Sequence, residues 1–432
     1  MNPSNEPKKI ILLGAGLRGQ TYTDKMADMD GAFRVVAVAE PIADRRAYIR
    51  EKHGIPDADC TESWEPLMER PKFADAVVIA TMDRGHYEPA MAAIRRGYDI
   101  LLEKPMSARP DECMKIAQAA KAAGVHVLVC HVLRYTAFFR ALKAIIDSGR
   151  IGDVVHIQHA ECVGNVHQSH SFVRGNWKNS EESSCMILQK SCHDMDILQW
   201  LIGKPCRRVQ SFGGLYYFRE ENAPAGAPER CTDGCPVGDT CPYNAVKLYL
   251  EDRKNDWFRT SATHRVHPTD ADVEQALRTT EYGKCVFRCS NNVVDHQTVN
   301  LEFAGGATVS FTMCAFNQGE RAIRIMGTRG ELRAEMGNPV IDCYDFATRQ
   351  TWQLPVDNMV RDQSIVGGHG GGDAGIVRVF SDVLHGDTSG ICDITETCEN
   401  HMIAFAAEAS RITGRVIDMA EFDARVLSGA EP

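Results

Sequence analysis

Short apolar runs alternate with amphipathic stretches from Lys9 to about Cys130. The runs predict strands that are buried on both faces over Ile10–Leu13, Val35–Ala39, Ala76–Ala80, Ile100–Leu102 and Val125–Val129. The stretches between them repeat apolar residues at a spacing near 3.6 and predict helices over Gly19–Asp28, Ala43–Lys52, Tyr87–Arg96 and Pro110–Ala123. Strands and helices that alternate in this way form a parallel sheet with right-handed crossovers. We therefore predict an α/β chain whose first domain spans residues 1–130.

The pattern changes after Tyr135, where this alternation stops. Stretches with period-two character predict strands over Val154–Ala160, Val299–Phe303, Ala307–Cys314, Ala322–Met326 and Glu331–Glu335. Helical spacing predicts helices over Phe138–Ser148, His193–Ile202, Ala374–Leu384 and Thr395–Ile412. This order predicts that residues 131–432 form an α+β domain with a large, mostly antiparallel open sheet, which would bind substrate and mediate oligomerisation. The late helix around residues 374–385 is expected to pack back near the first domain.

Composition narrows the class of function. The 432 residues are 44% hydrophobic and 25% charged, which is ordinary for a globular enzyme. The net charge is −10, and no basic tract is long enough to neutralise a row of phosphates, so we expect no nucleic-acid partner. No apolar stretch approaches the roughly 20 residues of a membrane span, and the N-terminus does not resemble a secretory signal. Several of the 16 cysteines, among them Cys113 and Cys130, lie inside apolar patterns, which indicates a reduced, cytoplasmic protein.

A glycine-rich motif over residues 14–19 follows the first predicted strand and opens the first helix. Glycines at this spacing permit a tight turn and let N–H groups at a helix N-terminus approach a pyrophosphate, as in the Rossmann dinucleotide site. A simple turn is the structural alternative. Glu40 ends the next strand, where a carboxylate can accept hydrogen bonds from adenosine ribose hydroxyls. Its charge would repel a 2′-phosphate, so we predict NAD, with NADP as the less favoured alternative because of Arg45 and Arg46. The predicted cofactor contacts here are Gly14, Gly16, Leu17, Arg18, Gly19 and Glu40.

Further motifs follow along the chain. They are Ala80-Thr81, Gly85-His86, Glu103-Lys104-Pro105, His131-Val132-Leu133-Arg134-Tyr135, His193-Asp194-Met195-Asp196, and His369 with Asp373 before a late helix. Together with the glycine loop they make nearly the whole chain resemble the Gfo/Idh/MocA family of oxidoreductases. The resemblance implies an NAD(P)-dependent dehydrogenase that acts on CH–OH groups, with a sugar, polyol or glycoside as substrate. It also implies a homo-oligomer, a dimer or tetramer, because an antiparallel sheet with one exposed face is commonly buried against another subunit.

The resemblance implies roles for single residues. Thr81 and Glu103 would line the nicotinamide end of the cofactor, with His86 near it and Arg134 among the cofactor contacts. Lys104 would lie between nicotinamide and substrate. The chemistry supports a lysine there independently, because the hydroxyl proton must be taken or polarised while hydride leaves the carbon. An ammonium does both if burial and the cationic ring lower its pKa, whereas the alternative is a surface lysine in a solvated turn.

His193 is the second candidate for catalysis and resembles the acid/base histidine of the family. In inositol-dehydrogenase-like members an Asp four residues earlier assists that histidine, but Gln189 occupies the position here and supplies no carboxylate. Gln189 is therefore predicted to orient the imidazole or bind a substrate hydroxyl. Lys190 and Asp196 are neighbours that could compensate, Lys190 as a second ammonium near the substrate. The alternative is that His193 is a buried histidine at the entry of its helix.

Two segments rich in polar and sulfur groups complete the list of candidates. Residues 167–177 surround an aromatic side chain with hydrogen-bonding groups, so we expect His170, Arg174 and Trp177 to contact a sugar ring, with a solvated loop as the alternative. The irregular stretch from residue 222 to 242 lacks apolar residues for a core of its own, and a metal would fix such a loop. The candidate ligands of a structural zinc ion or an iron–sulfur cluster are Cys231, Cys235, Cys241 and Cys289, with a disulfide or free thiols as alternatives.

Three functions fit these residues. The first is an NAD-dependent oxidoreductase acting on a secondary hydroxyl. The second is a lyase or hydrolase in which transient oxidation acidifies a neighbouring C–H bond and a glycosidic group leaves by elimination. The third is a non-enzymatic, NAD-sensing regulator, against which Lys104 and His193 argue.

Overall fold

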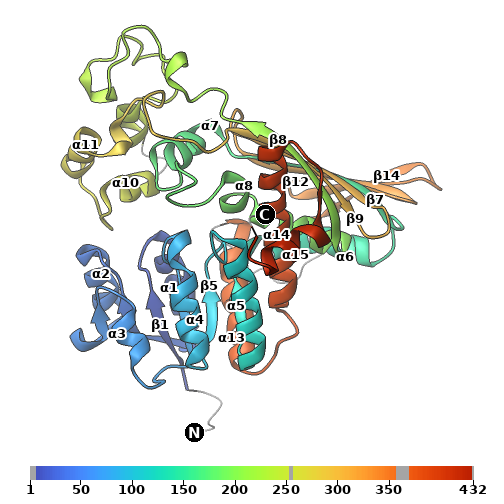
Figure 1. The fold of residues 1–432 in the computed structure, drawn as a ribbon, viewed down its shortest axis with the longest axis horizontal. Coiled ribbons are helices and arrows are strands. Elements are labelled where there is room, and N and C mark those ends of the chain that lie inside the picture. Colours follow the sequence, from blue (N-terminus) through green and yellow to red (C-terminus); the bar gives the residue numbers. More distant parts are fainter. Residues whose placement is uncertain (1–5, 253–255, 357–368, 431–432) are drawn as a thin grey trace.

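Two sheets organise the chain (Figure 1). The structure, a computed structural model, describes residues 6–252, 256–356 and 369–430. The first sheet has six parallel strands in the order β3-β2-β1-β4-β5-β6, and the second has nine strands in the order β14-β13-β12-β11-β7-β10-β9-β8-β15. The predicted fold class, a parallel Rossmann sheet followed by a mostly antiparallel one, is confirmed.

The first sheet follows from the alternation in the sequence. Its strands are β1 (Lys8–Leu13), β2 (Phe33–Ala39), β3 (Cys60–Thr61), β4 (Ala76–Ile79), β5 (Asp99–Leu102) and β6 (Val127–Val129). The helices between them are α1 (Leu17–Ala27), α2 (Ala43–His53), α3 (Glu65–Glu69), α4 (Tyr87–Arg95) and α5 (Pro110–Ala123). The central strands are apolar throughout because helices cover both faces of the sheet. The strand order reverses between β1 and β4, which opens a crevice at the carboxyl ends of these strands.

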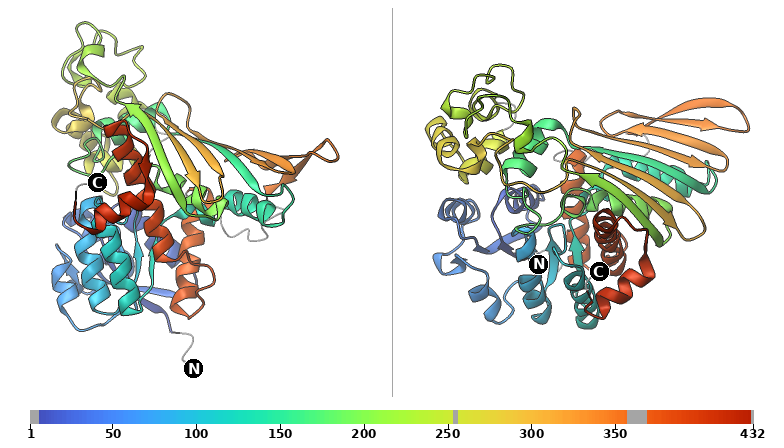
Figure 2. Two further views of the ribbon diagram at one scale, coloured as in Figure 1. Left: turned by 45° about the vertical axis from the view of Figure 1, so that its right-hand side comes forward. Right: turned by 45° about the horizontal axis from the view of Figure 1, so that its top comes forward.

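Helix α13 (Gly372–Leu384) returns to the first sheet from late in the chain. Its buried side chains Ile376, Val377 and Phe380 share one core with Ile10 and Leu12 of β1. The left view of Figure 2 shows this orange helix beside the parallel strands of the first domain. The described structure therefore places α13 with the first domain, although more than 240 residues of the second domain precede it.

The second sheet is covered by helices on one face. Its strands are β7 (Val154–Cys162), β8 (Cys206–Gly214), β9 (His296–Phe303), β10 (Thr308–Cys314), β11 (Glu320–Gly327), β12 (Gly330–Glu335), β13 (Val340–Asp345), β14 (Gln350–Pro355) and β15 (Ile417–Asp418). The helices are α6 (Ala137–Asp147), α8 (Met186–Gln189), α9 (Cys192–Ile202), α14 (Ile394–Thr413) and α15 (Met419–Leu427). Buried and exposed residues alternate along β9 and β10, so one face of the sheet packs on helices while the other stays open (Figure 2). Among the described residues, no helix has the length and apolar character needed to cross a bilayer.

A small lobe stands above the first domain (Figure 1). It contains α7 (Asn165–Gln168), a π-helical turn (Ser169–Arg174), the irregular stretch from residue 215 to 252, α10 (Asp256–Thr263) and α11 (Asp270–Thr279). The lobe contacts α2: the Arg45 guanidinium lies 3.3 Å from Nδ1 of His264, and the Val266 N–H donates to Asp44 at 2.9 Å. The lobe thus closes one side of the crevice above the first sheet.

Candidate active site

The glycine loop lies in the crevice where the strand order reverses. A Cβ atom on Gly14 would lie 2.5 Å from the Ala80 carbonyl oxygen, and one on Gly19 would lie 2.1 Å from the Gly14 carbonyl oxygen, so neither position accepts a side chain. Gly16 differs, because a Cβ atom there would meet only Arg45, at 3.8 Å. Gly16 also caps α1 without a side chain, so no capping side chain occupies the first N–H groups of the helix. These features fit the tight turn, close packing and open approach that a dinucleotide pyrophosphate requires.

Glu40 lies beside this loop at the carboxyl end of β2. Its carboxylate accepts the Ala15 N–H at 2.7 Å and the Ile42 N–H at 2.9 Å, and the residue is 4% exposed. A carboxylate oxygen has more than one acceptor site, so these bonds leave capacity for a ribose hydroxyl. The Arg46 guanidinium is turned to the main-chain carbonyl of Glu40.

Arg18 and Glu103, two predicted cofactor contacts, join in one ion-pair network. The Arg18 guanidinium donates to Glu103 at 2.6 Å and to Asp373 of α13 at 2.6 Å, and the Tyr22 hydroxyl donates to Glu103 at 2.7 Å. Burial alone would raise the pKa of Glu103, but Arg18 and Lys104 hold it below its usual value. The second Glu103 oxygen accepts the Lys104 N–H at 2.7 Å. The network therefore fixes the backbone from which Lys104 extends.

Lys104 reaches from the end of β5 to the second domain. Its ammonium donates to the main-chain carbonyl of Gln189, at the end of α8, at 2.5 Å. His86 supports the same turn, since its two ring nitrogens lie 2.7 Å from the Pro105 carbonyl and 3.0 Å from the Thr81 carbonyl. His86 thus ties the ends of β4 and β5 together, and its ring is buried.

His193 lies at the start of α9, near Lys104. Burial and then the charge of Lys104 hold its pKa well below the usual value, so its imidazole is neutral at physiological pH. Its Nδ1 is buried without a hydrogen-bond partner among the described residues. The ring of His131 lies 5.8 Å away, centroid to centroid, and His131 Nδ1 lies 3.1 Å from Asp196. The carboxylate of Asp196 thus contacts the neighbouring His131, whereas the position four residues before His193 carries no carboxylate.

Arg134 binds Asp196, the carboxylate that contacts His131. Its guanidinium donates to Asp196 at 2.6 Å and to Glu396 of α14 at 2.7 Å. Both bonds tie α9 and α14 to the turn after β6, so Arg134 positions these elements.

A second set of charges joins Lys190, which follows α8, to strands β7 and β11. The Lys190 ammonium lies 3.2 Å from Glu161 of β7, and Arg321 of β11 lies 2.6 Å from Glu161 and 3.1 Å from Asp194. Burial lowers the pKa of Lys190, and Arg321 and Lys104 lower it further while Glu161 opposes them. Sequence analysis missed Glu161 and Arg321, although they face each other in the β7–β11 register.

The three predicted sugar contacts separate in the structure. Trp177 is half-buried at the edge of the first domain, where its indole N–H donates to Asp83 at 3.2 Å, two residues after Thr81. His170 instead stacks on Phe258 at 3.9 Å inside the lobe, and burial lowers its pKa to about 3. Arg174 is 1% exposed and donates to the Lys284 and Tyr243 carbonyls. His170 and Arg174 therefore stabilise the lobe, and their assignment to substrate is corrected because the π-helical turn directs both side chains inward.

A group of metal-type ligands lies under the active site. Ligand atoms of His131, Cys192 and His401 lie within 4.8 Å of one another. His401 accepts the Met106 N–H at 3.0 Å through Nε2, and its Nδ1 faces the Thr397 carbonyl at 2.8 Å. Both nitrogens of His401 are therefore engaged in hydrogen bonds, whereas Nε2 of His131 is buried without a hydrogen-bond partner among the described residues.

The site and the fold together define a class. A glycine loop at the crevice of a doubly wound sheet, an acidic residue after β2, and a lysine that meets a neutral histidine across the domain boundary are the features of a dinucleotide-dependent oxidoreductase. Residues 8–131 match the oxidoreductase family with an NAD-binding Rossmann fold, and residues 143–350 match the C-terminal alpha/beta domain of that family. The chain belongs to the Gfo/Idh/MocA family of NAD(P)-dependent oxidoreductases.

Relatives and solved structures agree with this membership. An oxidoreductase named YteT from Bacillus subtilis is 24% identical over 369 residues, which are 77% of this chain and 82% of YteT. Inositol 2-dehydrogenase from Ralstonia nicotianae is 29% identical over 199 residues, 45% of this chain and 54% of its own length. The structure of levoglucosan dehydrogenase with NADH and levoglucosan has a TM-score of 0.69 at 16% identity, covering 96% of this chain and all of that one. At this identity the structural likeness shows the fold.

Proposed function

We propose that the protein is an NAD-dependent dehydrogenase that oxidises or reduces a secondary hydroxyl of a sugar, polyol or glycoside. The observation that carries this proposal is the meeting of Lys104 from the first domain with Gln189 and His193 from the second, above the crevice that holds the glycine loop. Names of relatives that act on inositol and levoglucosan support the substrate class.

The preference for NAD rests on Glu40. Its carboxylate is fixed beside the glycine loop by the Ala15 and Ile42 N–H groups, so it cannot turn away from an adenosine ribose. A 2′-phosphate at this place would bring two negative groups together. NAD, when bound, would exchange hydride with the substrate carbon.

Lys104 and His193 have different roles in moving the hydroxyl proton. The Lys104 ammonium uses one of its three N–H groups on the Gln189 carbonyl, which leaves the others for the substrate oxygen. His193, held neutral by burial, would accept the hydroxyl proton during oxidation and return it during reduction. Gln189 contributes its main-chain carbonyl to this arrangement, so the loss of a carboxylate at that position leaves the placement of Lys104 intact.

Substrate hydroxyls would be held by the second set of charges. Lys190 and Glu161 offer a donor and an acceptor on the sheet side of the cleft, and Trp177 offers an apolar face at the opposite edge. Polar groups around one apolar face are suited to a ring that carries several hydroxyls.

A sugar, polyol and glycoside screen that follows NADH absorbance and aglycone release tests the function. If the protein is a dehydrogenase, NADH accumulates with turnover. If the aglycone is released with no net formation of NADH, the protein is instead a lyase that works by elimination. NAD binding with turnover of neither kind would favour the sensing regulator.

Lys104→Ala tests the residue assignment on a substrate found in this way. We expect kcat to fall by about 10²- to 10⁴-fold, the usual contribution of a positioned acid/base group, while NAD affinity is retained. Lys121→Ala, at an exposed lysine far along α5, is the matched control and should leave kcat unchanged. An unchanged rate in Lys104→Ala would end the assignment.

A further inference from the structure

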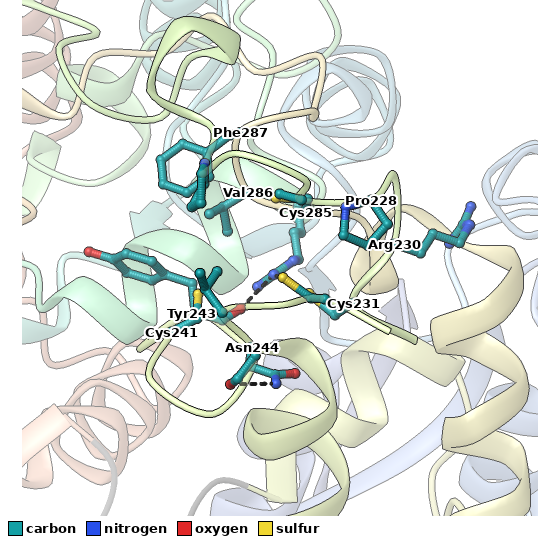
Figure 3. A pocket seen from close by; sticks show the side chains of 15 residues that line it. Pro228, Arg230, Cys231, Cys241, Tyr243, Asn244, Cys285, Val286 and Phe287 are labelled. Carbon is teal, nitrogen blue, oxygen red and sulfur yellow. Dashed lines mark hydrogen bonds between the residues drawn. The ribbon is translucent and has the colours of Figure 1, made fainter. Parts of the chain in front are cut away.

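The lobe contains a small cavity that the dehydrogenase chemistry does not use (Figure 3). Four cysteines line it, namely Cys231, Cys235, Cys241 and Cys285. Figure 3 shows Cys231, Cys241 and Cys285 reaching the cavity from different segments of the chain. The cavity volume is about 20 Å³, which is room for one water-sized body and too little for an iron–sulfur cluster of several atoms.

The backbone brings these thiols together from distant parts of the sequence. Arg230 and Lys284 form an antiparallel bridge, and the Cys285 N–H donates to the Glu229 carbonyl at 2.9 Å. Cys231 and Cys285 follow the bridged residues directly, so the bridge brings the segments that carry them side by side. Cys235 and Cys241 lie on the turn that follows Cys231, which is held by the bond from the Asn244 amide to the Gly238 carbonyl at 2.9 Å.

Arg174 provides an independent sign that an anionic group belongs here. It lines the cavity and is 1% exposed, yet no ion pair among the described residues joins it to a carboxylate. Its Nη1 has no hydrogen-bond partner in the described part of the chain, and the Cys231 sulfur lies 3.7 Å from Nη2. A buried guanidinium without a counter-charge is unfavourable, and neutral thiols do not supply one.

We propose that the lobe binds one zinc ion through the thiolates of Cys231, Cys235, Cys241 and Cys285. Binding forms four Zn–S bonds and releases four thiol protons without any redox change, leaving a centre of charge −2. Arg174, which lines the cavity, would offset part of that charge, and N–H donors to metal-bound sulfur are the usual second layer of such sites. A single ion would replace the apolar core that this irregular stretch lacks.

The thiols must move closer to bind the ion. Outside the group of His131, Cys192 and His401, no three metal-type ligand atoms of the described residues lie within 4.8 Å of one another. Zn–S bonds of 2.3 Å place tetrahedral sulfurs about 3.8 Å apart, so the turn from Cys231 to Cys241 would have to contract by at least about an ångström onto the ion.

Cys289 is excluded from the proposed site. Its thiol lies 3.4 Å from the Cys285 carbonyl, to which it donates, and it does not line the cavity. The structure thus replaces Cys289, the fourth ligand expected from the sequence, by Cys285. This difference supplies a matched control for the experiment.

Elemental analysis of the full-length protein, purified without chelator, tests the proposal. We expect one zinc per chain, lost in Cys231→Ser and Cys285→Ser and kept in Cys289→Ser. Because the first two variants could fail to fold, a mercurial thiol reagent is also titrated into the wild-type protein while a zinc-binding dye reports release. One zinc should appear as four thiols react.

Four outcomes would overturn the inference. They are a metal-free protein whose cavity thiols are all alkylated in the folded state, visible absorption with bound iron, a mass that is lower by two hydrogens for each disulfide, and zinc loss in Cys289→Ser. Each outcome is independent of whether a sugar substrate has been found.

Discussion

The buried carboxylate of Asp196 gives the most quantitative prediction. Asp196 is fully buried and accepts hydrogen bonds from Arg134 at 2.6 Å and from Asn400 at 2.7 Å, with His131 Nδ1 at 3.1 Å. In Asp196→Asn the shape is kept, but Arg134 loses its buried counter-charge. Breaking a buried pair in this way costs about 3–5 kcal/mol. Because Arg134 keeps its ion pair with Glu396, we expect the free energy of unfolding to fall by about 3 kcal/mol, the lower end of that range.

The matched control removes the other partner of Arg134. The Glu396 side chain is 39% exposed, and exposed pairs contribute about 1 kcal/mol or less. Urea unfolding should therefore show a large loss in the free energy of unfolding for Asp196→Asn and a small loss for Glu396→Gln, each relative to the wild type. Equal losses would refute the claim that burial, and not the number of ion pairs, decides the stability of this cluster.

The same variant has a distinct pH dependence. Burial alone would raise the pKa of Asp196, but Arg134 and His131 hold it below its usual value. A depressed carboxyl pKa stabilises the fold above the unfolded pKa of about 3.9 and loses that contribution as pH falls further. The stability gap between wild type and Asp196→Asn should be constant above about pH 5 and shrink below about pH 4.

Two other predictions concern the cofactor and the proton. Gly16→Ala meets nothing nearer than Arg45 at 3.8 Å and should unfold at the wild-type temperature, yet calorimetric titration should show NAD bound at least about tenfold more weakly. Gly19→Ala places Cβ 2.1 Å from the Gly14 carbonyl oxygen and should lower the unfolding temperature as well; equal behaviour of the two variants would contradict the loop assignment. Because the pKa of His193 is held well below its usual value near 6.5, kcat/KM should stay level from pH 7 to 6 and fall only in more acid solution. An acid midpoint at or above 6.5 in the pH–rate profile would argue against His193 as the base.

The first domain could be predicted almost completely from the sequence, because each buried strand is a short apolar run. Strand β3 escaped the pattern, because it is only two residues long and carries no periodicity. The return of α13 was expected, but the side chains that it buries against β1 depend on contacts that span hundreds of residues.

The site was predictable where a motif carries the chemistry and not where packing decides it. Lys104 and His193 come from motifs, whereas Glu161 lies just beyond the predicted end of its strand and pairs with Arg321 only through the register of β7 and β11. The composition of residues 167–177 indicated sugar contacts, but composition does not show which side chains a π-helical turn points inward. Cys285 and Cys289 both lie more than 40 residues after Cys241, so their spacing does not show which of them is near the loop; the bridge between Arg230 and Lys284 brings Cys285 to it.

The return of α13 has a practical consequence for anyone who would divide this protein. A fragment cut after the sixth strand would leave Ile10, Leu12 and Tyr22 without the cover of Ile376 and Phe380, and Arg18 without Asp373. Such a fragment should aggregate when expressed alone. A stable nucleotide-binding fragment would need a changed chain connection, in which a short linker joins residues 372–384 to the end of the last parallel strand.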